Sequence, residues 1–134
     1  MKTTTARDIM SSRLIVAKEG KNVEEALKLL VNNKITGLPV VNGKGKMVGI
    51  LSEYDIIAKV GKGKVLNPEV FQGELPYTKV VEAVTEDTNL EEILERFINA
   101  KCRHLPVLDK AGLLVGIISR RDVMKVLYYR SKVS

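Results

Sequence analysis

The chain repeats itself at a fixed spacing of 67 residues. Sliding the sequence against itself by that distance pairs residues 14–60 with residues 81–127, and 16 of the 47 pairs are identical without a single gap. Most of the other pairs keep their apolar character. Self-similarity at a fixed period indicates structural units that stack against each other. The chain is therefore expected to fold as two copies of one small unit.

Both copies begin with the same predicted elements. A short apolar run, at residues 14–16 and 80–84, predicts a strand. Asn22 and Asn89 stand as helix N-caps, each with a glutamate three residues later. Apolar residues behind them follow the i, i+3, i+4, i+7 spacing of a helix with one buried face. Each copy thus opens with a strand and an amphipathic helix.

A hairpin and a second helix complete each copy. The turn sequences are "NGKG" and "DKAG", and the second helices start at Ser52 and Ser119. The element order is β-α-β-β-α, twice. The predicted hairpin strands are residues 38–41 and 47–51 in the first copy, and 105–108 and 113–118 in the second.

The fold class predicted from this order is α+β. Neither half has enough residues for an independent core, so we expect the halves to pack around a pseudo-twofold axis as one module. The expected boundaries are residues 1–60 for the first motif, 61–78 for a connector and 79–134 for the second motif. Gly and Pro mark the connector, with one short helical turn at residues 68–72.

Composition narrows the class of protein. With 45% hydrophobic and 28% charged residues, the sequence is typical of a folded globular chain. It has no apolar run long enough to cross a bilayer, and the opening "MKTTTARDIM" lacks the apolar stretch of a secretory signal. We therefore predict a cytoplasmic location and no membrane partner. The single cysteine, Cys102, offers neither an internal disulfide nor a thiol pair for a metal.

The formal net charge is +6, which has two interpretations. It favours polyanionic or phosphorylated partners such as nucleic acid or a nucleotide. It also serves solubility alone, because the lysines are spread along the chain. Both interpretations stay open at this point.

The turns "GILSEYD" and "GIISRRD" repeat a Gly, an Ile, a Ser and an Asp at one spacing. Ser-x-x-Asp before an apolar helical run is the pattern of a capping box. A helix N-terminus also presents free N–H groups and a favourable field to a phosphate, and an Asp one turn later can accept from ribose hydroxyls. Capping and ligand binding are compatible interpretations.

The residues before the two Leu-Pro-Val strands differ between the copies. The second copy has Arg103 and His104, whereas the first has Thr36 and Gly37. If the turn of one copy lies near this edge of the other, two chemically different clefts result, of which the first has cationic donors for a phosphate. The predicted cleft residues are Ser52, Asp55, Arg103 and His104 in the first, and Ser119, Asp122, Thr36 and Arg120 in the second.

The sequence contains no recognisable catalytic set. His104 is the only histidine, and no Cys, Ser or acid can be placed beside it. A single histidine does not make a metal site. We predict no catalytic residues, no metal and no required cofactor.

These motifs resemble those of the cystathionine β-synthase (CBS) domain pair, also called the Bateman module. The resemblance rests on the Gly-Ile-x-Ser-x-x-Asp turn, Leu-Pro-Val before a hairpin, the element order and the tandem duplication. It covers nearly the whole chain, and "ARDIM" at residues 6–10 is similar to the family's lead-in.

The resemblance implies a stand-alone sensor rather than an enzyme. Family members bind adenosyl ligands such as AMP, ADP, ATP or S-adenosylmethionine in clefts between the motifs, and signal to a partner that the sequence does not identify. The Asp would hold the ribose and the Ser would approach the phosphate. The base would lie against Val81 in the first cleft or Ile15 in the second. A homodimer through exposed helix faces is also implied.

Two features depart from the family pattern, and one alternative function remains. The basic pair is Arg-His where the family often has His-Arg, and Glu82 would oppose a triphosphate in the first cleft. The alternative is a nucleic-acid-binding protein, favoured by the charge but opposed by an aromatic content of only 4%. Steep weakening of binding with salt would separate that function from nucleotide sensing.

Overall fold

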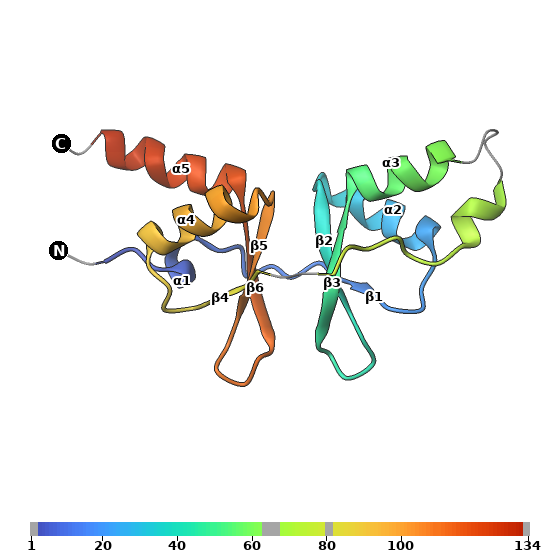
Figure 1. Ribbon diagram of the computed structural model, residues 1–134, viewed down its shortest axis with the longest axis horizontal. Helices are drawn as coiled ribbons and strands as arrows, with labels where there is room; N and C mark the ends of the chain where they lie inside the picture. Colours follow the sequence, from blue (N-terminus) through green and yellow to red (C-terminus); the bar gives the residue numbers. More distant parts are fainter. Residues whose placement is uncertain (1–2, 63–67, 80–81, 133–134) are drawn as a thin grey trace. The chain divides into compact units, whose positions relative to one another are not determined.

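Each sequence repeat forms its own three-stranded sheet with helices against it (Figure 1). The computed structural model describes residues 3–62, 68–79 and 82–132. Contacts divide the chain into two compact units, which we call the first-repeat unit (Ile15–Val80) and the second-repeat unit (Met1–Leu14 with Val81–Ser134). The α+β class predicted from the sequence is confirmed.

The first-repeat unit contains one mixed sheet in the order β1-β2-β3. Its first pair of strands is parallel and its second pair is the predicted hairpin, with Leu38 opposite Leu51. The elements are β1 (Ala17–Lys18), α2 (Val23–Asn33), β2 (Gly37–Val41), β3 (Met47–Ser52), α3 (Glu53–Lys62) and the 3₁₀ turn η1 (Pro68–Gln72).

The second-repeat unit has the same topology in the order β4-β5-β6. Leu105 lies opposite Ile118, which is the same register as in the first unit displaced by one repeat. The elements are α1 (Ala6–Ile9), β4 (Val84–Thr85), α4 (Leu90–Ala100), β5 (His104–Leu108), β6 (Leu114–Ser119) and α5 (Arg120–Ser131).

Each unit has its own apolar core between one sheet face and its helices. Leu38 and Leu51 are fully buried in the first core, as are Leu105 and Ile118 in the second. Burying such a side chain stabilises a fold by about 1.5–3 kcal/mol. The Leu-Pro-Val strands are therefore explained by packing, because all three residues are buried in both repeats.

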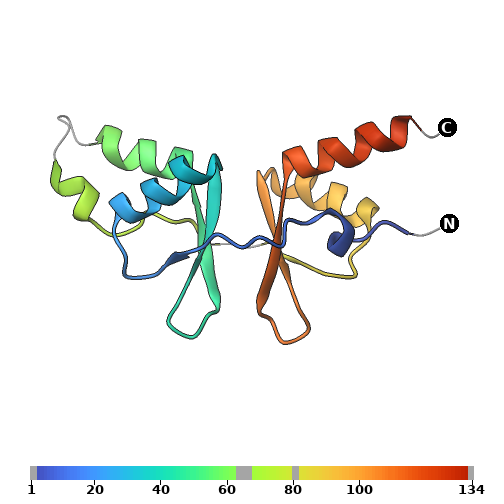
Figure 2. The same ribbon diagram turned by 180° about the vertical axis from the view of Figure 1, so that it is seen from behind.

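The lead-in to each repeat packs on the unit formed by the other repeat. Helix α1 buries Ala6 and Ile9 in the second-repeat core, and the chain after it pairs with β6 through Ser11 and Ile117 (Figure 2). In the first-repeat unit, Thr78 pairs in the same way with Ile50 of β3. The compact units of the fold therefore differ from the motif boundaries 1–60 and 79–134 expected from the sequence, because each unit includes the lead-in to the other repeat.

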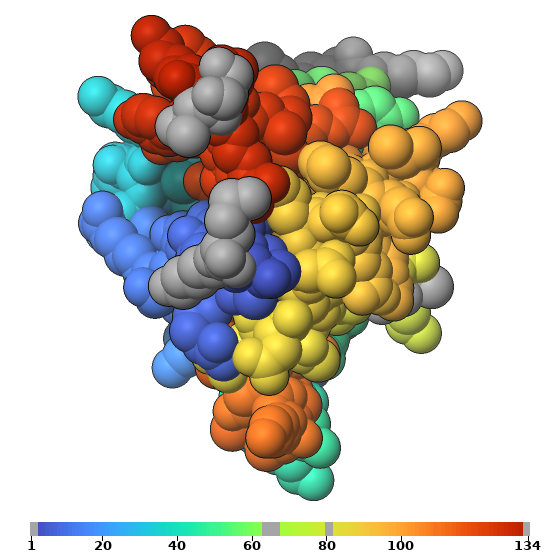
Figure 3. Space-filling view, turned by 90° about the vertical axis from the view of Figure 1, so that its left-hand side faces the viewer, coloured from blue at the N-terminus to red at the C-terminus, as the bar shows by residue number. Residues whose placement is uncertain are grey.

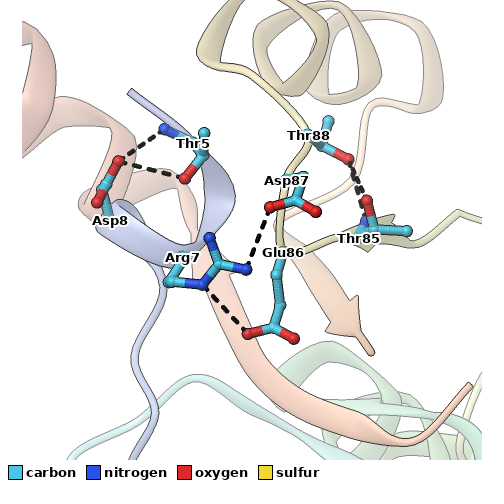
Figure 4. A network of polar contacts seen from close by, with 7 residues as sticks. All are labelled: Thr5, Arg7, Asp8, Thr85, Glu86, Asp87 and Thr88. Atoms are coloured by element: carbon cyan, nitrogen blue, oxygen red, sulfur yellow. Dashed lines mark hydrogen bonds and ion pairs between the residues drawn. The ribbon is translucent and has the colours of Figure 1, made fainter. Parts of the chain in front are cut away.

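Polar contacts hold α1 in place (Figure 4). The Arg7 guanidinium donates from Nη2 to Asp87 Oδ1 at 3.1 Å and lies 3.5 Å from Glu86 Oε2. These carboxylates raise the pKa of Arg7. At the start of the helix, the amide and the hydroxyl of Thr5 both donate to the Asp8 carboxylate. The sequence pattern alone had identified this segment only as a lead-in.

The predicted caps and turns are confirmed. The side chains of Asn22 and Asn89 accept from the amides of Glu25 and Glu92 at 3.0 and 2.9 Å. In both hairpin turns the first side chain, Asn42 or Asp109, accepts from two amides further along the turn. Positive φ values at the last turn residues, Gly45 and Gly112, close the turns. The short helical turn at Pro68–Gln72 is also present.

The first strands of the two repeats differ from the predicted ranges 14–16 and 80–84. In the first repeat the apolar residues 14–16 lie outside the sheet, and only Ala17–Lys18 pairs with β2. In the second, the pairing begins at Val84. In the first repeat, Leu14 belongs to the second-repeat unit and Ile15 to the first-repeat unit, so the apolar character of this run does not reflect ladder pairing. Val80 and Val81 of the second predicted run lie outside the described residues.

The structure also bears on membrane insertion. Among the described residues, no helix combines the length and the apolar character that a bilayer span requires.

Candidate ligand site at the repeated helix starts

The last residue of β3 begins helix α3, and its side chain is held by a reciprocal pair of bonds. Ser52 Oγ accepts from the Asp55 amide at 3.2 Å, and Asp55 Oδ2 accepts from the Ser52 amide at 3.0 Å. Both residues are half-buried. This is the predicted capping box, and it fixes the rotamers of both side chains.

The start of α5 has the same geometry. Ser119 Oγ accepts from the Asp122 amide at 3.1 Å, and Asp122 Oδ2 accepts from the Ser119 amide at 2.8 Å. The cap interpretation of the repeated turn is therefore confirmed at both positions. Capping occupies one oxygen of each Asp and leaves the hydroxyl hydrogen of each Ser able to donate to another group.

The second oxygen of the two aspartates is used differently. Asp55 Oδ1 accepts from the Thr78 hydroxyl at 3.2 Å. Within the described part of the chain, Asp122 Oδ1 has no such bond. The helix start of the first-repeat unit thus carries one more ordered hydroxyl than its counterpart.

Sequence reasoning missed Thr78, because residues 61–78 were assigned to the connector. A signal was available: Thr78 lies 67 residues after Ser11, so both repeats place a hydroxyl residue at that position. In the fold, both positions pair with the middle of the strand that leads to the capped helix.

The residue before each Leu-Pro-Val strand contacts the helix start of the same unit through its backbone. The Thr36 carbonyl accepts from the Glu53 amide at 3.0 Å, and the Arg103 carbonyl accepts from the Arg120 amide at 3.2 Å. This contact follows from the hairpin register, which pairs His104 with Ser119. Within its own unit, α5 begins beside basic residues and α3 begins beside Thr36.

Arg120 is partly committed to another task. Its guanidinium donates to the carbonyls of Cys102 at 3.0 Å and Lys101 at 3.4 Å, just past the end of α4. Helix-terminal carbonyls need such donors. Cys102 lies half-buried at the edge of the second core, where burial raises the pKa of its thiol.

The structure describes one of the two residues predicted to contact the base. Ile15 is half-buried at the start of the first-repeat unit, and Val81 lies outside the described residues. Glu82, whose charge was expected to oppose a triphosphate, forms an ion pair with Arg96 of α4, with Oε2 and Nη1 2.5 Å apart. Arg96 offsets much of that negative charge.

Each predicted cleft combines residues from both units, and these combinations stay predictions. Inside single units, the structure brings together Thr36, Ser52 and Asp55 in one, and Arg103, His104, Ser119, Arg120 and Asp122 in the other.

The acidic side chains and the few other possible metal ligands are spread over the described residues. Across residues 3–62, 68–79 and 82–132, no three His, Cys, Asp or Glu side chains gather as metal ligands would. The carboxylates at the starts of α2 and α4 lie in the first helical turn, where the helix dipole stabilises them.

Comparison with known proteins agrees with this geometry. The chain is 38% identical to the chloroplastic CBS domain-containing protein CBSX1 of Arabidopsis thaliana over 84% of its length, and it spans 58% of that protein. Among solved structures, CBSX2 in complex with AMP superposes with a TM-score of 0.83 at 30% identity, covering 96% of this chain and 99% of that one.

A second solved structure is the CBS domain pair of protein MJ0100 in complex with 5′-methylthioadenosine and S-adenosyl-L-methionine. It has a TM-score of 0.80 at 27% identity, with 96% of this chain and 99% of that one covered. The sequence model of the CBS domain matches residues 6–62 and 73–129, two stretches offset by the same 67 residues as the internal repeat. The chain therefore belongs to the CBS domain family and carries two CBS domains.

Proposed function

We propose that the protein is a non-catalytic regulatory module that binds adenosyl ligands, such as AMP, ADP, ATP or S-adenosylmethionine, and signals occupancy to a partner protein. The observation that carries the proposal is the pair of identically built Ser-x-x-Asp helix starts, in a chain similar to proteins solved with such ligands. A cytoplasmic location stays a prediction from the sequence.

The helix starts have the chemistry that a nucleotide needs. The first amides of a helix and its dipole favour a phosphate, and a serine hydroxyl adds one donor. The carboxylate oxygens not used in the caps can accept from ribose hydroxyls. Because the caps fix both side chains before a ligand arrives, little rotamer entropy would be lost on binding.

The grouping of residues by ligand comes from the family resemblance and is part of the proposal. Arg103 and His104 supply cationic donors to one ligand, and Thr36 supplies a hydroxyl to the other. The first ligand would contact Ser52, Asp55, Arg103, His104 and Val81; the second would contact Ser119, Asp122, Thr36, Ile15 and Arg120.

Thermal unfolding against AMP, ADP, ATP, S-adenosylmethionine, GTP and inorganic phosphate tests the ligand class. A ligand at about 100 times its dissociation constant adds about 2.7 kcal/mol of stability, which moves the midpoint by several degrees. We expect shifts with adenosyl compounds. Equal shifts with GTP or phosphate would argue against adenosyl recognition.

The site assignment is tested by Asp55→Ala and Asp122→Ala. Each variant loses a cap as well as a ribose acceptor, so the quantity to compare is the ligand-induced shift rather than the midpoint itself. Asn22→Ala is the matched control, because it removes a cap on α2 without touching either helix start. The assignment is wrong if both Asp variants keep the full shift.

We also propose a homodimer through the helix faces. Val31 and Ile98 occupy the same position in the two repeats and are 70% and 71% exposed, and Ile57 and Met124 form a second exposed pair. In the first-repeat unit, the space between α2 and α3 is a hollow of about 400 Å³ lined by Leu27, Val31 and Ile57, among others. Apolar side chains exposed at equivalent positions of both repeats favour burial by a second copy.

Sedimentation equilibrium checks the dimer. Ile57→Glu and Met124→Glu should each shift the protein toward the monomer, because a charge would be buried at the interface. Lys44→Glu, on a hairpin turn, is the control and should leave the mass unchanged. A wild-type monomer at every concentration would overturn this part of the proposal.

A further inference from the structure

Helix α5 differs in charge from its counterpart in the first repeat. Helix α3 carries two acidic and two basic residues and is neutral. Over residues 120–132, α5 and its C-cap carry five basic residues against one acidic residue, a net charge of +4. The repeat preserved the fold of this helix but not its surface, so core packing does not explain the difference.

Most of α5 is exposed to solvent. Val123 is its one buried residue, and Figure 3 shows the helix, in red, at the surface of its unit beside the N-terminal segment in dark blue. Arg121, Lys125, Tyr128 and Lys132 follow each other at intervals of four, three and four residues. Such spacing places side chains on one face of a helix. We call these four residues the α5 basic face.

The cations of this face have no acidic partner among the residues that the structure describes. In the part of the protein that the structure describes, neither Arg121 nor Lys125 takes part in an ion pair. The helix's one carboxylate, Asp122, is bound to the Ser119 amide. Like charges held side by side on one helix cost stability, which a polyanionic partner would recover.

Two exposed tyrosines accompany the cations. Tyr128 and Tyr129 are 57% and 68% exposed, and their ring centroids lie 5.7 Å apart with the planes tilted by 60°. The Lys132 ammonium lies 5.0 Å from the centre of the Tyr128 ring. An aromatic ring beside unpaired cations is the combination that single-stranded nucleic acids use, with bases stacked on rings and phosphates on cations. The low aromatic content of the whole chain had concealed this local cluster.

We propose that the α5 basic face binds single-stranded nucleic acid. The arrangement disfavours an anionic membrane, because Tyr128 stands among cations on the same face, whereas an interfacial helix separates its apolar side from its charges. The exposed apolar residues Met124 and Leu127 lie outside the α5 basic face, and Met124 belongs to the dimer surface proposed above. This inference goes beyond ligand sensing and does not depend on it.

Fluorescence anisotropy of the full chain with a fluorescein-labelled 15-nucleotide oligo-dT or oligo-U tests the proposal. With three phosphate contacts, the logarithm of affinity should fall with the logarithm of salt with a slope of about −2. Affinity at 200 mM salt should be roughly 20-fold weaker than at 50 mM. Absence of binding at 50 mM salt would overturn the proposal.

Matched variants locate the surface. Replacing Arg121 and Lys125 together by Gln should weaken binding, whereas replacing Lys44 and Lys46 by Gln removes the same charge from the hairpin turn of the other unit and should not. Tyr128→Ala should weaken binding about fivefold or more, and Tyr128→Phe should not, because it keeps the stacking ring. All of these side chains are exposed, including Lys46, which directly follows the hairpin turn. Substitutions at such positions change stability little.

Three results would contradict the proposal. Equal losses of affinity in the Arg121/Lys125 and Lys44/Lys46 double variants would mean that net charge alone attracts the oligonucleotide. Unchanged affinity of the Tyr128→Ala variant for the oligonucleotide would show that no base stacks on this ring. Binding to phosphatidylserine–phosphatidylcholine vesicles without binding to the oligonucleotide would assign the face to a membrane. An AMP-induced thermal shift that persists in every α5 variant would show that ligand sensing holds even where nucleic-acid binding fails.

Discussion

At the scale of single residues, the repeated aspartates share one contact and differ in another. Each uses one carboxylate oxygen to cap a helix. Thr78 then distinguishes Asp55 from Asp122 by occupying its second oxygen. A ribose hydroxyl at Asp55 would have to share that oxygen with Thr78 or displace it, so the two helix starts are chemically different even where their sequences agree.

Two glycines at equivalent positions should differ in what an added methyl group costs. A Cβ on Gly49 would lie 2.5 Å from the Thr78 carbonyl oxygen, which is backbone, whereas on Gly116 it would meet the flexible Met10 side chain. We expect Gly49→Ala to lower the free energy of unfolding by about 3 kcal/mol and Gly116→Ala by about 1 kcal/mol. Urea unfolding measures both values.

Gly43→Ala is the control for this pair, since its Cβ would meet nothing within 4 Å and its φ is not positive. It should change stability by less than about 0.5 kcal/mol. A larger loss at Gly116 than at Gly49 would contradict the close backbone approach at Thr78.

The Cys102 thiol should react slowly near neutral pH. Burial raises the pKa of this thiol, and the thiolate is the reactive form. Its reaction rate with a disulfide reagent should therefore rise with pH through a midpoint that lies above that of a free cysteine. The same midpoint in native and urea-unfolded protein would show that burial has no effect.

At the scale of elements, helices α2 and α4 both end at a residue with a left-handed backbone conformation. Lys34 follows α2 and Lys101 follows α4, and both have left-handed backbone angles, with φ of 54° and 51°. A residue with a side chain is disfavoured in this conformation, where glycine is the usual choice. The repeat thus keeps a lysine where backbone geometry alone would favour Gly.

Lys34→Gly and Lys101→Gly should each stabilise the protein by about 0.5–1 kcal/mol, because glycine relieves the left-handed strain. Differential scanning calorimetry should show a midpoint raised by a few degrees. Lys28→Gly, at an exposed position inside α2, should have the opposite sign and cost about 1 kcal/mol. If Lys34→Gly and Lys101→Gly lowered stability as much as Lys28→Gly, the side chains of Lys34 and Lys101 would stabilise the helix ends through their own contacts.

At the scale of the whole molecule, the exchange of lead-ins couples the repeats. The N-terminal segment completes the core of the second-repeat unit, and residues after η1 complete the core of the first. Neither repeat can therefore be cut out at residues 1–60 or 79–134 without removing part of a core. Stability of each unit depends on sequence from the other half of the chain.

Ile9→Ala and Leu75→Ala should weaken different units. Ile9 is buried in the second-repeat core and Leu75 in the first, each 8% exposed. Each truncation should cost about 2 kcal/mol. In native-state hydrogen exchange, Ile9→Ala should lower protection mainly in β5, β6 and α4, and Leu75→Ala mainly in β2, β3 and α2. If Ile9→Ala instead affected the elements closest to it in sequence, the exchange of lead-ins would be wrong.

The sequence by itself determined the features that depend on neighbouring residues. The asparagine caps, the hairpin turns and the Ser-x-x-Asp helix starts all involve bonds across two to four residues, so local patterns were enough to predict them. The 67-residue repeat is visible in the sequence itself. The α+β class followed from their order.

Tertiary structure alone decided what distant segments do. The docking of α1 on the second repeat, the bond from Thr78 to Asp55 and the binding of Arg120 to the carbonyls after α4 join residues that no local spacing relates. The same holds for the first strand of the first repeat, where Ala17–Lys18 pairs in the sheet and the apolar residues 14–16 do not. Burial and hydrogen bonding at long range depend on which chain segment arrives at each core, and this is settled only when the whole chain folds.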